Sequence, residues 1–246
     1  MTFSIVARDP ETGDFGIAVA SKALAVGAVA PYARAGVGAI STQAAPNVTY
    51  GPDGLERLAA GDGAAKVLAA LTSADSMAAV RQAGIVDVAG RAATYTGSSC
   101  IDWAGGKTVP GATAQGNCLV GPEVVDAMLA AYQAATGSFP RRLLAALQAG
   151  DQAGGDSRGR QSAALLVVRD KGGPGQGNDR WVDLRVDDHT APCTELGRLL
   201  AVQEKQGDLL DPDHLKEIGS ALAGTLKSTI RSAMAPKTPE PPATPK

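Results

Sequence analysis

Short runs of apolar residues, some of them alternating with polar residues, predict β-strands along most of the chain. The first run, 2–7, is followed by a turn at 9–14 and then by a second run at 15–20. The turn contains Pro10 and Gly13, and this order predicts an antiparallel hairpin. Further strands are predicted at 36–43, 82–88, 92–96, 112–118, 162–168 and 181–186.

Helical spacing of apolar residues is found between these strands. Leu55 and Leu58 follow a turn rich in glycine, and the same spacing recurs at 64–73. The segment 21–34 is small and apolar and contains Pro31, which predicts a loop packed close to the sheet. Further helices are predicted at 123–136, 140–149 and 192–204.

The order of the predicted elements favours antiparallel sheets. Groups of strands and pairs of helices follow one another, whereas a parallel sheet requires strands and helices to alternate one for one. Two stacked sheets between two helical layers bury every apolar face, so we expect an α+β protein with a four-layer αββα sandwich. In this architecture an N-terminal strand can end inside a cleft. A single antiparallel sheet covered by helices on one face is the alternative.

The length and the composition divide the chain into one large domain and a C-terminal appendage. With 246 residues and a hydrophobic share of 44%, the chain can bury a sizeable core, which we place at 1–206. Leucine and isoleucine recur at helical spacing after 211, so 207–234 is predicted to be a helical extension. The proline-rich tail 235–246 is predicted to be disordered.

The charge and the cysteines exclude several classes of protein. A net charge of -2 without a lysine or arginine run, and an aromatic content of 4%, argue against binding to nucleic acid. The three cysteines, Cys100, Cys118 and Cys193, have no Cys-x-x-Cys spacing, so neither a disulfide framework nor a zinc site is predicted. No apolar run reaches the ~18 residues of a membrane span, and the start lacks the pattern of a signal peptide. We therefore expect a soluble, cytoplasmic protein without a metal or a cofactor.

The second residue is a candidate nucleophile. If Met1 is removed, Thr2 carries a hydroxyl and an α-amine, and an amine with a reference pKa of about 8 can act as a base at neutral pH. The chain has only two histidines, His189 and His214, which leaves little for a Ser-His-Asp site. Threonine is also a good strand former, so its position alone fits a purely structural role.

Four clusters mix glycine with Asn, Gln, Ser or Asp at predicted strand ends. Such loops are common places for sites, although turn chemistry explains any one of them alone. The clusters are Ser41-Thr42-Gln43 with Asn47, the stretch 96–105, Gln115-Gly116-Asn117, and the stretch 154–162. Their combination in one alanine-rich chain predicts a site.

These clusters and several shorter motifs carry a resemblance to a known family. The motifs lie at 2–7, 19–22, 35–39, 42–43, 50–52, 103–105, 115–117, 121–125, 154–156, 158–163 and 182–189. From Thr2 to about Leu200 the chain resembles the family catalogued as domain of unknown function 1028, which is grouped with the N-terminal nucleophile (Ntn) hydrolases. The resemblance implies the αββα sandwich and supplies no substrate. Some members are labelled as pilin or fimbrial assembly proteins, a label that this globular pattern does not support.

The predicted mechanism starts from Thr2. Its Oγ would attack a carbonyl, its amine would take the proton, and a covalent acyl-enzyme would then be hydrolysed. Lys22, at the outer end of the hairpin, could lower the pKa of the Thr2 amine and hydroxyl. Asp156 could hold Lys22 or the amine in place, and Asn117 could donate to the developing oxyanion.

The remaining candidates would bind the substrate. Gln43 could also donate to the oxyanion, and Asn47 belongs to the same polar cluster. Arg158 and Arg160 could anchor a carboxylate, and Ser162 could orient the amine. For most of these residues, ordinary turn or surface roles are the alternative.

Three other groups compete with Thr2. Ser4 shares a strand face with Thr2 but would need three residues removed to gain a free amine. Cys100 or Cys118 could be a thiol nucleophile, although small buried cysteines are common and no histidine is evident beside them. The cluster 187–189 could bind a metal, but it lacks a spaced set of ligands.

The sequence therefore predicts an N-terminal-nucleophile amidohydrolase that cleaves a small amide or related acyl compound. The competing function is a non-catalytic small-molecule-binding protein on the same scaffold, in which Met1 stays attached. An assembly subunit with a large exposed apolar face is a third possibility. We expect a small-molecule amide as the partner, no nucleic acid, no membrane, and a homo-oligomer such as a dimer.

Overall fold

The computed structural model describes residues 2–206, 220, 222 and 224–227. The contacts divide the chain into a first unit, Met1–Val202, and a second unit, Gln203–Lys246. The predictions for 207–234 and 235–246 lie outside the described residues, except that 220, 222 and 224–227 are helical. None of the helices in the described part has the length and apolar character needed to cross a membrane.

The first unit contains a six-stranded antiparallel sheet with the strand order β10-β9-β2-β1-β8-β7. Its central strand β1 begins at Thr2, which lies opposite Ser21 of β2 and Asn117 of β8. The predicted hairpin of the first two strands is thereby confirmed. The strands are β1 (Thr2–Arg8), β2 (Phe15–Ser21), β7 (Trp103–Val109), β8 (Ala112–Leu119), β9 (Ser162–Val168) and β10 (Arg180–Val186).

A second antiparallel sheet has four strands in the order β3-β4-β5-β6. Two of its strands contact the six-stranded sheet: β4 contacts β1, and β5 contacts β8. The presence of two sheets excludes the single-sheet alternative. The strands are β3 (Pro31–Arg34), β4 (Gly38–Ala44), β5 (Arg81–Asp87) and β6 (Ala92–Thr96).

Two strands were not predicted from the sequence. β3 lies in the segment expected to be a loop, and it pairs only with β4, at the edge of its sheet. Pro31 is its first residue, where the missing N–H costs least in the ladder. β7 contains Gly105 and Gly106, which weaken the apolar alternation that marks a strand.

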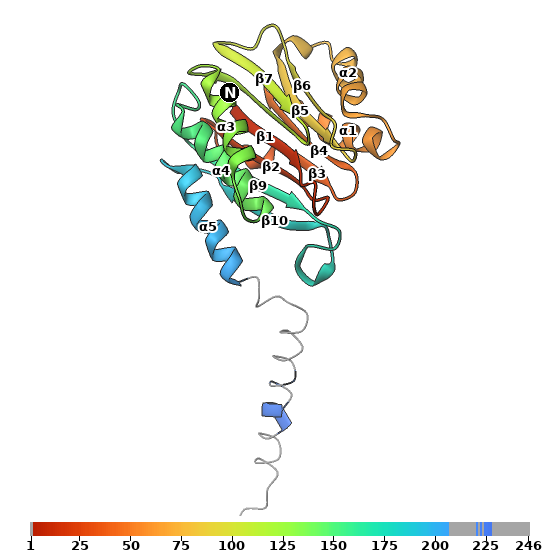
Figure 1. Cartoon of the computed structure of the whole chain (residues 1–246), viewed down its shortest axis with the longest axis vertical. Coiled ribbons are helices and arrows are strands. Elements are labelled where there is room, and N and C mark those ends of the chain that lie inside the picture. The colour runs from red at the N-terminus through yellow and green to blue at the C-terminus, as the bar shows by residue number, and fades with distance from the viewer. Residues whose placement is uncertain (1, 207–219, 221, 223, 228–246) are drawn as a thin grey trace, which may run out of the picture. The chain divides into compact units, whose positions relative to one another are not determined.

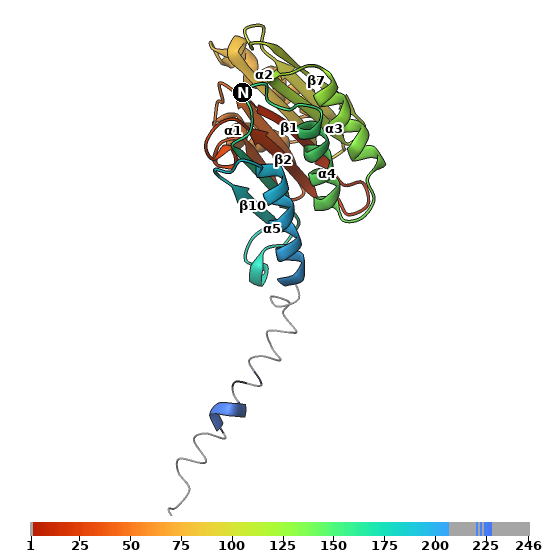
Figure 2. The same cartoon turned by 90° about the vertical axis from the view of Figure 1, so that its left-hand side faces the viewer.

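Helices cover one face of each sheet (Figures 1 and 2). α1 (Tyr50–Ala59) and α2 (Ala64–Ala74) contact the four-stranded sheet. α3 (Glu123–Ala134) and α4 (Phe139–Gln152) contact the six-stranded sheet. The first unit is thus an α+β structure with two antiparallel sheets and helices, as predicted. The other helices are α5 (Pro192–Gln206) and the short 3-10 segments η1 (Val26–Ala28), η2 (Ala78–Val80) and η3 (Pro174–Gln176).

The period-two pattern of β1 explains how this strand joins two different layers. Phe3 and Ile5 belong to the core shared with α3 and α4, on one face of the strand. Val6 points to the other face, into an apolar cluster with residues of both sheets, such as Ile17 of β2 and Val86 of β5. Toward the start of β1 that same face carries Ser4 and Thr2, so the layer between the sheets changes from apolar to polar at this end.

Candidate functional site

Polar side chains fill the space between the sheets at the end where β1 begins. All of them are 4% exposed or less. Buried polar groups are costly unless they are hydrogen-bonded, and a core layer made of apolar residues would avoid that cost. Their concentration here marks this end of the sheets as the candidate site. This inter-sheet polar cluster consists of Thr2, Ser4, Ser21, Ser41, Gln43, Gln82, Thr113, Gln115 and Asn117.

Three carboxamides meet beside Thr2. Gln43 Nε2 donates to the Thr2 carbonyl oxygen at 3.2 Å, and Asn117 Nδ2 approaches the same oxygen at 3.4 Å. The same two nitrogens donate to Gln82 Oε1 at 2.8 and 2.7 Å. Gln82 Nε2 in turn donates to the Gly116 carbonyl oxygen at 2.7 Å. The start of β1 is therefore held by side chains from β4 and β8, and Gln82 of β5 links these two side chains to each other.

The Thr2 hydroxyl has a defined partner. Thr2 Oγ1 lies 3.1 Å from Ser21 Oγ, on the neighbouring strand β2. Thr2 itself is 4% exposed. Within the described part of the chain, the hydroxyl is thus held at the sheet end by a second hydroxyl.

In the inner part of the cluster, a chain of hydrogen bonds runs from Gln115 through Ser4 to Gln43. Ser4 Oγ donates to Gln43 Oε1 at 2.7 Å, and Gln115 Nε2 donates to Ser4 Oγ at 2.7 Å. A Cβ atom on Gly84 would lie 2.2 Å from Gln115 Oε1, so the glycine leaves the room that this amide occupies. Packing therefore constrains Gln115 in addition to its hydrogen bonds.

One acceptor in the cluster has no hydrogen-bond partner among the described residues. Asn117 Oδ1 is buried, and Asn117 as a whole is 1% exposed. Unpaired buried acceptors are rare in folded proteins. This oxygen lies on the residue opposite Thr2 in the β1 and β8 pairing.

Asp156 ties two loops together at the same end of the six-stranded sheet. Its carboxylate accepts from the backbone N–H of Lys22 at 2.9 Å. It also accepts from the Arg158 guanidinium at 3.1 and 2.8 Å, and its side chain is 1% exposed. The Lys22 side chain is exposed, and its Nζ donates to the Arg160 carbonyl oxygen at 3.3 Å. Asp156 therefore contacts the backbone of Lys22 and not its ammonium group.

The other two predicted residues of this loop also have partners in the protein. Arg160 Nε donates to Asp151 Oδ1 at 2.6 Å. Ser162 Oγ donates to the Ala23 carbonyl oxygen at 2.6 Å and accepts from the Val26 N–H at 3.1 Å. These contacts join the start of β9 to the segment that follows β2.

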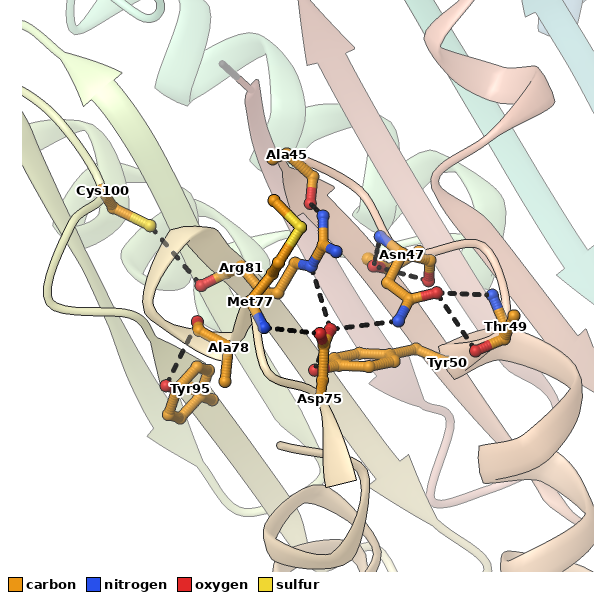
Figure 3. Close-up of polar contacts among 11 residues, drawn as sticks. Ala45, Asn47, Thr49, Tyr50, Asp75, Met77, Ala78, Arg81, Tyr95 and Cys100 are labelled. Carbon is orange, nitrogen blue, oxygen red and sulfur yellow. Dashed lines mark hydrogen bonds and ion pairs between the residues drawn. The ribbon is translucent and has the colours of Figure 1, made fainter. Parts of the chain in front are cut away.

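Asn47 belongs to a second arrangement, centred on Asp75 (Figure 3). Asp75 Oδ2 accepts from Asn47 Nδ2 at 3.0 Å, from the Tyr50 hydroxyl at 3.1 Å and from Arg81 Nε at 2.9 Å. Asp75 Oδ1 accepts from the Met77 backbone N–H at 2.8 Å. The Met77 N–H, followed by the Asn47 and Arg81 side chains, holds the pKa of Asp75 well below its usual range.

A pocket of about 620 Å³ opens beside Asp75, between the start of α1 and the end of α2. Burial, together with the hydrogen bond to Asp75, raises the pKa of Tyr50 well above its usual value, so its hydroxyl stays protonated. The lining includes both polar and apolar residues. It consists of Asn47, Thr49, Tyr50, Asp53, Glu56, Arg57, Ala70, Leu71, Ala74, Asp75 and Ser76.

The competing groups have a different environment. Burial raises the pKa of the Cys100 and Cys118 thiols, which favours the less nucleophilic protonated form at neutral pH. His189 Nδ1 accepts from the Ala191 N–H at 3.0 Å, and Asp187 pairs with Arg185 at 2.9 Å. Within the residues that the structure describes, no three His, Cys, Asp or Glu side chains are grouped closely enough to hold a metal ion.

Exposed apolar side chains occur on the loops at the Thr2 end of both sheets. The strand pairings place the loops 22–30, 45–49, 75–80, 97–102 and 120–122 at this end. The apolar residues range from 36% to 67% exposed. We call them the apolar rim: Leu24, Val29, Val48, Met77, Ile101 and Val120.

Six members of the cluster were not assigned as site residues: Ser4, Ser21, Ser41, Gln82, Thr113 and Gln115. Ser4 was considered only as a competing nucleophile, and Ser41 and Gln115 only as parts of polar clusters. Ser21 lies in a motif that carried the family resemblance, but no role was predicted for it. Gln82 and Gln115 each stand among small and apolar residues of a strand. The available signal was a glutamine on the inward face, since Gln82 shares its strand face with the buried residues Gly84 and Val86.

Comparisons with known proteins agree with the sequence motifs. The model of a family of unknown function, DUF1028, matches residues 2–196. The crystal structure of protein SPO2555 from Silicibacter pomeroyi, also described by the DUF1028 family model, is similar with a TM-score of 0.75 and 37% sequence identity. The similarity covers 82% of this chain and 88% of that chain. No curated protein matches the sequence.

Proposed function

The chain belongs to DUF1028, a family of unknown function, and we propose that it is an amidohydrolase whose nucleophile is Thr2, freed by removal of Met1. The observation that supports this most is the position of Thr2. It begins the central strand of the larger sheet, inside a buried cluster of amides and hydroxyls. A layer of this polarity is hard to explain as packing alone.

The proposal includes the αββα layer order of Ntn hydrolases. Contacts of β1 with β4 and of β5 with β8 support two facing sheets. Contacts of α3 and α4 with one sheet, and of α1 and α2 with the other, support helical outer layers. In such an arrangement the start of β1 lies where a substrate can approach between the sheets.

The chemistry would proceed in two steps, acylation of Thr2 and hydrolysis of the resulting ester. Thr2 Oγ attacks the carbonyl carbon of the amide, and its proton passes to the Thr2 amine and then to the leaving nitrogen as the C–N bond breaks. Water then attacks the resulting ester, which releases the acid and restores the hydroxyl. Ser21, at 3.1 Å from Thr2 Oγ1, would orient the nucleophile before the attack.

The remaining predicted residues would act around this centre. Lys22 would contribute positive charge near the sheet end, and Asp156 would fix the backbone that carries it. Gln43 would contact the substrate at the inter-sheet polar cluster. Arg158 and Arg160 are held by Asp156 and Asp151, so a substrate carboxylate would have to share them with these partners.

The apolar rim suggests the character of the substrate. Apolar side chains exposed on five loops around one sheet end favour a ligand with an apolar group next to its carbonyl. We therefore propose an acyl compound with an apolar acyl or amine portion. Because Thr2 is 4% exposed, the proposal also requires that removal of Met1 opens access to its hydroxyl.

The test is a comparison of turnover between matched variants. Amides, lactams and acylated amino acids, each with apolar and polar acyl groups, are screened against the wild type, Thr2→Ala and Thr2→Ser. We expect Thr2→Ala to fold and to lose turnover by about 100-fold or more, and Thr2→Ser to retain part of it. Thr113→Ala, which removes another buried threonine hydroxyl from the same layer, should keep its turnover.

Equal turnover by the wild type and Thr2→Ala would refute this function. Loss of turnover in Thr113→Ala to the same extent would also count against it, because the effect would then follow from a disturbed layer and not from the nucleophile.

The pocket beside Asp75 favours a second candidate, the binding of a small polar molecule without turnover. In that case the ligand would stabilise the protein against thermal unfolding whether or not Met1 is present. Substitutions at Asp53 or Thr49 would weaken that effect, whereas Thr2→Ala would leave it unchanged.

A further inference from the structure

The side-chain amide of Asn117 uses only its nitrogen within the described structure. Nδ2 donates to Gln82 Oε1 at 2.7 Å and approaches the Thr2 carbonyl oxygen at 3.4 Å. Oδ1 is buried and has no partner among the described residues. A nitrogen already shared by two acceptors is poorly suited to receive an oxyanion, while a buried free acceptor calls for a donor.

Gln82 determines which way this amide faces. Its Nε2 donates to three acceptors: the Gly116 carbonyl at 2.7 Å, the Gly105 carbonyl at 3.2 Å and Thr96 Oγ1 at 2.9 Å. Its Oε1 must therefore face Asn117 and accept a hydrogen bond there. Exchanging the nitrogen and oxygen of Asn117 would set Oδ1 against two other acceptors, so the observed orientation is the one that the network permits.

The strand register supplies the position of the missing donor. Asn117 lies directly opposite Thr2 in the antiparallel pairing of β1 and β8. Facing residues of such a pair have their side chains on the same side of the sheet, with Cβ atoms about 5 Å apart. A charged or neutral amine on Thr2 would be a donor within reach of that side chain.

We propose that Asn117 Oδ1 accepts a hydrogen bond from the free α-amine of Thr2, and that Gln82 is the positioning residue that turns Asn117 to do so. This inference rests on the proposed function, since it requires a chain that begins at Thr2. One N–H of the amine stays on Asn117 Oδ1, which leaves the nitrogen lone pair to take the proton of Thr2 Oγ. Asn117 thus acts on the base and not on the oxyanion.

The inference fixes the direction of a measurable pKa. An acceptor stabilises an ammonium group more than a neutral amine, so Asn117 raises the pKa of the Thr2 amine relative to a variant without the acceptor. Asn117→Leu should lower that pKa by about 1, and Asn117→Asp should raise it. Gln82→Leu should lower it as well, although Asn117 is still present, because the amide is then free to turn.

The experiment uses the full chain beginning at Thr2, released from an N-terminal fusion by a protease that leaves no extra residue. Brief acetylation at a series of pH values, followed by mass spectrometry of the N-terminal peptide, gives the pKa of the amine. Gln115→Leu is the matched control, because it removes a buried amide of the same strand whose bonds go to Ser4 and Thr113 and not to Thr2 or Asn117. It should leave the amine pKa unchanged.

An unchanged pKa in Asn117→Leu would overturn the inference, and so would an equal decrease in Gln115→Leu. If Asn117→Leu fails to fold, the absence of an increase in Asn117→Asp overturns it instead. An unchanged pKa in Gln82→Leu overturns the positioning role of Gln82. Because these measurements need no substrate, a pKa that responds as expected in a protein without turnover would preserve the contact and refute the amidohydrolase function.

Discussion

Removing the Asp75 carboxylate should destabilise the protein strongly, because four hydrogen-bond donors meet at this side chain (Figure 3). It receives four hydrogen bonds, from Asn47, Tyr50, Met77 and Arg81. The Asp75 and Arg81 side chains are only 10% and 13% exposed. Asp75→Ala would leave all four donors without this acceptor, and Asp75→Asn would remove the charge that pairs with Arg81.

The expected magnitude follows from these contacts. A buried donor that loses its partner costs about 1–3 kcal/mol, and breaking a buried ion pair costs about 3–5 kcal/mol. Because the pocket beside Asp75 admits water and Arg81 keeps a bond to the Ala45 carbonyl at 2.7 Å, the lower ends of these ranges apply. We expect the free energy of unfolding to fall by about 4 kcal/mol in Asp75→Ala and by about 2 kcal/mol in Asp75→Asn.

The same carboxylate gives the stability a pH dependence of known sign. Its pKa is lowered in the folded chain, whereas an unfolded aspartate has a pKa of about 3.9. The stabilisation is therefore fully present above about pH 4 and is lost as the pH falls through the folded pKa. The difference in unfolding free energy between the wild type and Asp75→Asn should be largest near neutral pH and should shrink below about pH 4.

Urea denaturation followed by circular dichroism, at pH 7 and at steps down to pH 3, measures both effects. Asp126→Asn is a suitable control, because Asp126 pairs with Lys107 at the surface and is 51% exposed, so its loss should cost less than about 1 kcal/mol. A cost below about 1 kcal/mol for Asp75→Asn at pH 7, or a difference that does not vary with pH, would refute the reasoning.

Two other substitutions test the packing of the sheets. Gly84→Ala would place a Cβ atom 2.2 Å from Gln115 Oε1 and should cost about 2–4 kcal/mol in urea denaturation, most of which Gln115→Ala in the same chain should restore; additive costs would contradict this. Arg169 donates to Asp14 at 2.6 Å and lies 3.6 Å from the centre of the Trp181 ring, so Arg169→Lys should cost about 1–2 kcal/mol and alter the fluorescence of Trp181. Unchanged fluorescence would show that the stacking is unimportant in solution.

Much of the fold could be predicted because apolar patterning and turn residues act locally. The continuous apolar run at 162–168 forms a buried strand of the same bounds, and the hairpin of 2–7 and 15–20 forms as predicted. β3 and β7 were missed because their own apolar pattern is weak. They form strands because they pair with β4 and β8, whose pattern is clearer. Glycine in β7 and proline in β3 weaken the local signal that tertiary pairing then overrides.

The site was predictable where strand pairing brings residues together. Thr2 and Asn117 meet because β1 and β8 are adjacent. Gln43 reaches the Thr2 carbonyl oxygen from the other sheet. Gln82 could not be assigned, since its role depends on how the two sheets face each other. Asn47 contacts Asp75, a residue far along the chain, so its place beside the pocket depends on tertiary packing that no local pattern records.

The central claim is that Thr2 is the free first residue of the working protein. The mass of the N-terminal peptide of the purified chain tests it most directly. We predict a peptide that begins at Thr2 in the bulk of the molecules. A peptide that still carries Met1 would remove the proposed base from the nucleophile and contradict the claim.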